Sequence, residues 1–99
     1  MKEQKDKMIT IVNNFGIRNQ LKKLSEEVFE LQEAVINYDV NNDKDNMNNI
    51  IEELADVTNL TNQIKHYYNI EESNLNDVLD YKVNRTLERI QSGYYNKSL

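Results

Sequence analysis

The sequence contains no cysteine, no proline and no tryptophan, and only two glycines. Without cysteine, the chain forms no disulfide, offers no thiolate to a metal and has no cysteine nucleophile. Without proline, little interrupts regular secondary structure. No run of about 18 apolar residues occurs, so we expect neither a secreted nor a membrane-spanning protein. These absences favour a cytoplasmic location.

Basic residues are also scarce: 12 lysines and arginines stand against 17 aspartates and glutamates, which gives a net charge of −5. Nucleic-acid polymers are held mainly by excess positive charge, so we expect no DNA or RNA partner. A small anion stays compatible with this charge if metal ions bridge it to acidic side chains. We expect residues 1–99 to form one domain, whose small core favours oligomerisation.

The apolar residues have helical spacing through nearly the whole chain. This spacing predicts a first helix over 5–13, closed by Gly16 in the left-handed conformation, and a second helix over 17–38. The second helix carries an apolar seam suited to packing on another helix. Its members are Leu21, Leu24, Val28, Leu31, Val35 and Tyr38.

A third helix is predicted to follow the polar segment 39–45 and to end near Tyr68, with Asp43 or Asp45 as its N-cap. Its seam, which includes Leu54, repeats the spacing of the second helix.

A fourth helix is predicted after the segment 69–74, with Ser73 or Asn74 as its N-cap and Gly93 just beyond its end. Connections as short as these favour antiparallel neighbours. We therefore expect an all-α fold, a compact antiparallel bundle of about four helices.

An acidic pattern occurs twice, 26 residues apart, as EEVFEL at 26–31 and EELADV at 52–57. Residues three apart share a face of a helix, so each copy offers a pair of carboxylates on one face. These pairs are Glu27 with Glu30, and Glu53 with Asp56.

Both pairs lie on the same flank of the apolar seam of their helix when residues are placed about 100° apart. In a close-packed bundle this flank borders a neighbouring helix, where four carboxylates repel one another and are costly to bury. A divalent cation offsets that cost. Oxygen ligands favour Mg²⁺ or Mn²⁺ over Zn²⁺, and Mg²⁺ commonly joins carboxylates to substrate phosphates. The sequence therefore predicts a metal site for a phosphorylated substrate.

The fourth helix carries Lys82, Arg85 and Arg89 on one flank, which suits the oxygens of a polyphosphate. Ordinary ion pairs with nearby acids are the alternative for these residues. On the second helix, Gln20 and Lys23 lie one turn before the first acid pair on the same side. They are candidate nucleotide contacts, and Gln20 is suited to hydrogen-bond a sugar or a base.

Three segments resemble the MazG-like all-α nucleoside triphosphate pyrophosphohydrolases: 16–34 (GIRNQLKKLSEEVFELQEA), 52–60 (EELADVTNL) and 81–89 (YKVNRTLER). That family is marked by EExxE followed, after a variable gap, by ExxD. Here the two motifs begin at Glu26 and Glu53. The two acidic motifs in this order, followed by the basic segment 81–89, are more specific to the family than EExxE alone.

The resemblance implies a Mg²⁺-dependent enzyme that cleaves a nucleoside or deoxynucleoside triphosphate into the monophosphate and pyrophosphate. Its biological role would be housecleaning or control of the nucleotide pool. The metal ligands carried over from the family motifs are Glu27, Glu30, Glu53 and Asp56.

The resemblance also implies that Lys82 and Arg85 hold phosphates, and that Glu26 is a candidate proton acceptor or a residue that supports the ligands. Such proteins form dimers or tetramers with sites near subunit interfaces, so a homodimer or homotetramer is expected. The resemblance does not specify the preferred base.

The alternative is a non-catalytic helical module for dimerisation or another protein interaction, in which the acids only keep the surface soluble. Such a module predicts no turnover and no stabilisation by metal ions. A ferritin-like iron site normally needs Glu-x-x-His pairs, and His66 is the single histidine, which excludes that site.

Overall fold

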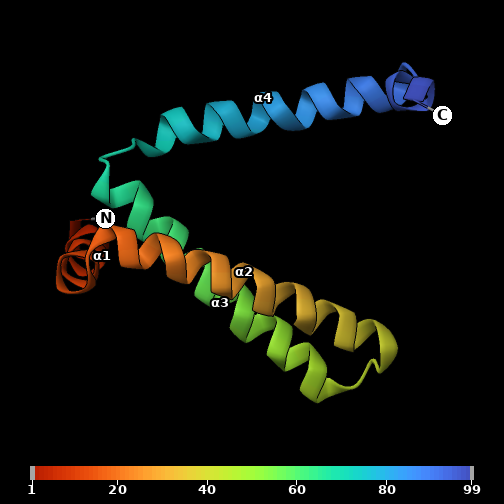
Figure 1. The fold of residues 1–99 in the computed structure, drawn as a ribbon. Helices are drawn as coiled ribbons and strands as arrows, with labels where there is room; N and C mark the ends of the chain where they lie inside the picture. The colour runs from red at the N-terminus through yellow and green to blue at the C-terminus, as the bar shows by residue number, and fades with distance from the viewer. Residues whose placement is uncertain (1, 99) are drawn as a thin grey trace. The chain divides into compact units, whose positions relative to one another are not determined.

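The computed structural model describes residues 2–98, and every regular element in this range is helical. The elements are four α-helices and a final 3₁₀ helix (Figure 1): α1 (Lys2–Phe15), α2 (Ile17–Val40), α3 (Lys44–Tyr67), α4 (Glu72–Gln91) and η1 (Tyr94–Ser98). The predicted all-α fold of about four helices is confirmed. Within the described range, no helix combines the length and the apolar character needed to cross a lipid bilayer.

The chain divides into two compact units, residues 1–69 and 70–99, which are described separately. In the second unit, the described residues of α4 include no buried one. The guanidinium of Arg85 lies 5.6 Å from the centroid of the Tyr81 ring, and that of Arg89 lies 4.7 Å from the centroid of the Tyr94 ring. The second of these cation–π contacts links α4 to η1.

In the first unit, α2 and α3 form an antiparallel hairpin and lie side by side along their length (Figure 1). Gln20 Nε2 donates a hydrogen bond to Gln63 Oε1 at 2.8 Å, and Asn46 Nδ2 donates to the Asn37 carbonyl oxygen at 3.4 Å. From Gln20 forward to Asn37 and from Gln63 back to Asn46 is 17 positions in each helix. The two helices therefore stay in step from one end of the hairpin to the other.

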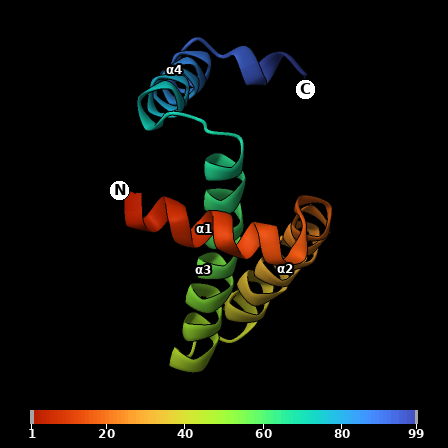
Figure 2. The same ribbon diagram turned by 90° about the vertical axis from the view of Figure 1, so that its left-hand side faces the viewer.

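The helix α1 lies across the open end of this hairpin and contacts both α2 and α3 (Figure 2). Gly16 alone joins α1 to α2, with φ 92° and ψ 140°. The positive φ favours glycine, as expected, but this ψ is not that of the left-handed helix, so that detail of the prediction is wrong. Among residues 3–69, the buried apolar residues come from all three helices and are Met8, Val12, Ala34 and Leu60.

The face of α2 that packs includes only half of the predicted apolar seam. Three members of the seam are half-buried: Leu24, Leu31 and Tyr38. The buried residues of α2 are Gln20, Glu27 and Ala34, each one position before a seam residue and therefore about 100° round the helix from it. Val28 and Val35, which belong to the seam, are 39% and 48% exposed. The flank that carries the acids thus borders the neighbouring helix, as predicted. The exposed half of the seam does not, because Gln20, Glu27 and Ala34 take the most deeply buried positions of the contact.

The cap of α3 matches one of the two predicted residues, and the cap of α4 matches neither. Asp43 is the N-cap of α3, and its Oδ1 accepts a hydrogen bond from the Asn46 backbone N–H at 2.8 Å. At α4 the N-cap is Glu71, because the Leu75 N–H already bonds to the Glu71 carbonyl oxygen at 3.1 Å. Ser73 and Asn74 therefore lie inside the helix, and their prediction as caps is wrong.

We expect Asp43→Ala to lower the free energy of unfolding by about 1 kcal/mol, since it removes the side-chain acceptor of an N-cap. Asp45→Ala is the matched control, because Asp45 lies in the first turn of the same helix and contributes only a few tenths of a kcal/mol through the helix dipole. Urea denaturation measures both. Equal losses in the two variants would contradict the assignment of Asp43 as the cap.

Candidate metal centre

Three carboxylates converge at the contact between α2 and α3. Glu27 and Glu30 come from α2 and Glu53 from α3, and one oxygen of each lies within 4.8 Å of the others. Two local causes bring them together. The spacing of three places Glu27 and Glu30 on one face of α2, and the hairpin register sets Glu53 level with Glu30. Of the four predicted metal ligands, these three form one group.

The group is only partly neutralised by the protein. Glu27 is 6% exposed, and Glu27 Oε2 and Glu53 Oε2 are both buried without a hydrogen-bond partner among the described residues. Lys23 Nζ lies 3.4 Å from Glu27 Oε1, but the Lys23 side chain is 56% exposed. One mostly solvated ammonium does not balance three carboxylates, and buried charged oxygens without partners are costly. The negative charge of the group is therefore not fully compensated, and a bound cation would compensate it.

The pKa values respond to this crowding. Burial is the main cause that raises the pKa of Glu53 from 4.5 to about 7, and the carboxyls of Glu27 and Glu30 add to the effect. Burial also disfavours ionised Glu27, but interactions of its carboxyl with Glu53, Lys23 and Glu30 outweigh it and lower its pKa. The cluster therefore holds one proton, on Glu53, up to about neutral pH.

Asp56, the fourth predicted ligand, is level with Glu27 in the register but is exposed and lies outside the group of three. It lines a cavity of about 300 Å³ together with Glu27. The predicted nucleotide contacts Gln20 and Lys23 line the same cavity. The remaining lining residues are Asn59, Leu60 and Gln63. A polar cavity thus lies directly beside the acidic group.

A second cavity, of about 310 Å³, lies on the other side of the acidic group, toward the loop of the hairpin. It is lined by Glu30, Glu33, Ala34, Asn37, Asn49 and Glu53. Glu53 and Glu30 therefore face this cavity, whereas Glu27 faces the first one. The acidic group lies between two cavities along one groove.

Gln63 is a residue of this groove that the sequence analysis missed. It is 4% exposed and bonds to Gln20 across the hairpin. A signal for it exists in the sequence: Gln20 lies seven residues before Glu27, and Gln63 lies seven residues after Asp56. In an antiparallel pair, equal spacings in opposite directions bring residues to the same level.

The other predicted site residues lie outside the acidic group. Glu26 is exposed on α2 and has no part in the three-carboxylate cluster. Lys82, Arg85 and Arg89 lie along α4 in the second unit, where no acid among residues 70–96 forms an ion pair with them. Arg85 and Arg89 contact aromatic rings instead, and Arg85 Nε is buried with no hydrogen-bond partner in the part of the chain that the structure describes.

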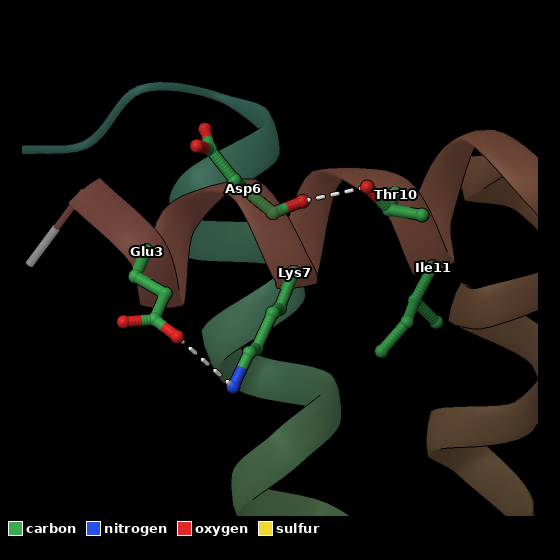
Figure 3. Close-up of a pocket in the computed structure, with 5 residues that line it drawn as sticks. All are labelled: Glu3, Asp6, Lys7, Thr10 and Ile11. Carbon is green, nitrogen blue, oxygen red and sulfur yellow. Dashed lines mark hydrogen bonds and ion pairs between the residues drawn. The ribbon is translucent and has the colours of Figure 1, made fainter.

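A further cavity, of about 740 Å³, lies along α1 and is a poorer candidate site (Figure 3). All five lining residues belong to α1: Glu3, Asp6, Lys7, Thr10 and Ile11. Lys7 Nζ lies 3.7 Å from Glu3 Oε1, and Thr10 Oγ1 donates to the Asp6 carbonyl oxygen at 2.8 Å. Glu3, Lys7 and Thr10 therefore have partners on their own helix, and the Asp6 carboxylate points away from them (Figure 3).

Comparison of the chain with protein-family models, with curated proteins and with solved structures gave no match. The resemblance to the MazG-like enzymes therefore rests on the residues of this chain alone.

The raised pKa of Glu53 predicts a pH dependence of stability for the metal-free protein. Because the folded-state pKa of about 7 lies above the usual 4.5, the proton on Glu53 stabilises the fold fully below about pH 4.5, and this contribution is lost as the pH rises through about 7. Glu53→Gln cannot ionise, so it should lack this loss and be more stable than the wild type above pH 7.

Urea denaturation in the presence of a chelator, at several pH values from about 5 to about 8, measures this difference. Glu52→Gln is the control, because Glu52 is an exposed neighbour of the same type on the same helix. Its stability should follow the wild-type curve. Parallel curves for the wild type and Glu53→Gln would show that Glu53 does not hold the proton.

Proposed function

We propose that this chain is a Mg²⁺-dependent nucleoside triphosphate pyrophosphohydrolase, which converts a nucleoside or deoxynucleoside triphosphate to the monophosphate and pyrophosphate. The observation that carries the proposal is the converging group of carboxylates with two buried oxygens that lack hydrogen-bond partners. Acids that only keep a surface soluble remain hydrated, and their oxygens are not buried. Buried and converging oxygens are what a cation site needs.

The donor set fits Mg²⁺, with Mn²⁺ as a substitute, because all its members are carboxylate oxygens. Glu27, Glu30 and Glu53 would hold the ion, and Asp56, level with Glu27, is the fourth proposed ligand. When bound, Mg²⁺ would neutralise charge on the triphosphate and lower the pKa of the attacking water.

Hydrolysis of the anhydride joins the oxygen of water to phosphorus and breaks the bond between the α and β phosphates, and pyrophosphate leaves with the bonding electrons. Lys23 could bind a substrate phosphate, because its side chain is largely exposed and lines the cavity next to Glu27. Glu26, which is exposed one position before Glu27, is a proposed proton acceptor or a support for the ligands. We further propose that Lys82, Arg85 and Arg89 bind phosphates, which is supported by the lack of ion pairs between them and the acids among residues 70–96.

A homodimer or homotetramer in the cytoplasm, acting in housecleaning or control of nucleotide pools, is the proposed setting. The exposed apolar row of α2, formed by Leu21, Val28 and Val35, supports an assembly, because a second copy would remove it from water. The same row is also the feature that the alternative function, a non-catalytic interaction module, would use. That alternative does not account for the buried carboxylate oxygens.

Purified protein with Mg²⁺ should release pyrophosphate from at least one member of a panel of canonical and modified nucleoside triphosphates. Glu53→Gln and Asp56→Asn should each lower the rate at least about a hundredfold, since several kcal/mol of transition-state charge stabilisation depend on the ligands. Pyrophosphate detection measures the rate, and circular dichroism checks that the helices persist.

The matched control is Glu52→Gln, which makes the same change on the outer face of α3 and should leave the rate within a few-fold of the wild type. Wild-type rates in both ligand variants would remove the metal centre from the proposal. No release from any nucleotide would favour the interaction module.

Mg²⁺ alone should also raise the melting temperature, because a ligand that binds the native state stabilises it. At about 100 times its dissociation constant the gain is about 2.7 kcal/mol, which corresponds to a rise of roughly 10 °C or more for a domain of this size. Differential scanning calorimetry with Mg²⁺ and with a chelator measures it. A rise of the same size in Glu53→Gln would mean that the ion binds elsewhere.

A further inference from the structure

We infer that the buried pair Gln20 and Gln63 reads the base of the nucleotide, through one hydrogen-bond acceptor and one donor that the pair leaves free. This inference rests on the proposed function and deepens it, because it names the part of the chain that selects among nucleotides.

The hydrogen-bonding capacity of the pair is only partly used. Gln20 is 6% exposed and Gln63 is 4% exposed, and Gln20 Nε2 donates to Gln63 Oε1 at 2.8 Å. Gln20 Oε1 and Gln63 Nε2 form no hydrogen bond with the described residues. Neither atom is among the buried side-chain atoms that lack a partner, so both are open to solvent at the cavity, and an acceptor and a donor are available side by side for a ligand.

The position of the pair fits the base end of a nucleotide whose phosphates lie at the acids. Both glutamines line the cavity of about 300 Å³ that also contains Glu27 and Asp56. Gln20 precedes Glu27 by seven residues, so the two lie about 10 Å apart along α2. Leu60, which is 5% exposed and lines the same cavity, offers an apolar surface to a ring.

An adjacent acceptor and donor complement a base edge that presents a donor beside an acceptor, which is how amide side chains recognise bases. Gln63→Glu changes this arrangement of donor and acceptor with little change in the shape of the side chain. The new carboxylate keeps an acceptor for Gln20 Nε2, but it replaces the free donor with a second acceptor. Two adjacent acceptors suit an edge with two adjacent donors, which among the canonical bases is the N1–H and amino group of guanine.

The experiment measures binding of non-hydrolysable α,β-methylene triphosphates of the canonical bases, with Mg²⁺ present, by titration calorimetry. In Gln63→Glu, the affinity for the guanine nucleotide relative to the others should increase at least about tenfold over the wild type. The matched control is Asn62→Asp, which adds the same charge one position away, at a residue that does not line the cavity. Its order of preference should be that of the wild type.

An unchanged order in Gln63→Glu, or the same reordering in Asn62→Asp, would overturn the inference. If Gln63→Glu does not fold, the side-chain amide resonances of the wild type decide the matter. In a ¹⁵N-labelled sample, those of Gln63 should shift when the analogue binds and should not shift with Mg²⁺ alone. No shift with the analogue also overturns the inference.

The two proposals fail in different ways. A wild type that releases pyrophosphate but selects its base without the glutamines leaves the proposed function intact and refutes only the base-reading pair. A wild type that neither releases pyrophosphate nor binds any analogue refutes both.

Discussion

The most deeply buried positions of the contact between α2 and α3 include acid and amide side chains where a helical pair usually carries apolar ones, and the rest of the first unit depends on this choice. The residues that α2 buries are Gln20, Glu27 and Ala34, which are seven apart and form one row. Only Ala34 among them gains from leaving water. Half-buried Leu24 and Leu31 flank this row, and α1 across the open end, the Asp43 cap and the hydrogen bonds between the helices add to the stability of the hairpin.

The polar contact also sets what the acidic group does when no cation is bound. A proton on Glu53 relieves the repulsion among the carboxylates up to about pH 7. A metal ion would act on the same oxygens, so the proton and the ion compete. The cluster has two ways to lose negative charge, whereas the exposed row of Leu21, Val28 and Val35 is not covered within the hairpin. For this reason we relate the acidic cluster to a bound cation and the exposed apolar row to an interface with another subunit.

The local parts of the fold could be predicted from the sequence, because they depend on neighbours along the chain. Helix spacing, the break at Gly16 and the choice of Asp43 or Asp45 as a cap are of this kind. The packed face of α2 could not be predicted from the sequence, because a helical wheel gives angles within one helix and does not show which flank of that helix contacts α3. An apolar row that another subunit would cover has the same pattern as one that faces a partner within the chain.

The candidate site also has features that the sequence predicts and features that it does not. The spacing of three that places Glu27 and Glu30 on one face of α2 is visible in the sequence, whereas the approach of Glu53 to them depends on the register of the hairpin. Gln63 was missed because an isolated glutamine has no preferred environment, and its role becomes visible only when the register pairs it with Gln20. The register is therefore the piece of information that the sequence lacks.

That register links the site to the fold. A slip of α3 by one helical turn would move its side chains by about 5.4 Å along α2, more than the 4.8 Å within which the three carboxylates lie. The same slip would break the hydrogen bond between Gln20 and Gln63 at one end of the hairpin and that between Asn46 and Asn37 at the other. These two contacts flank the acids and oppose the slip that would separate them. A pair of amides that holds the register and also faces the cavity would thereby couple the position of a bound base to the position of the carboxylates.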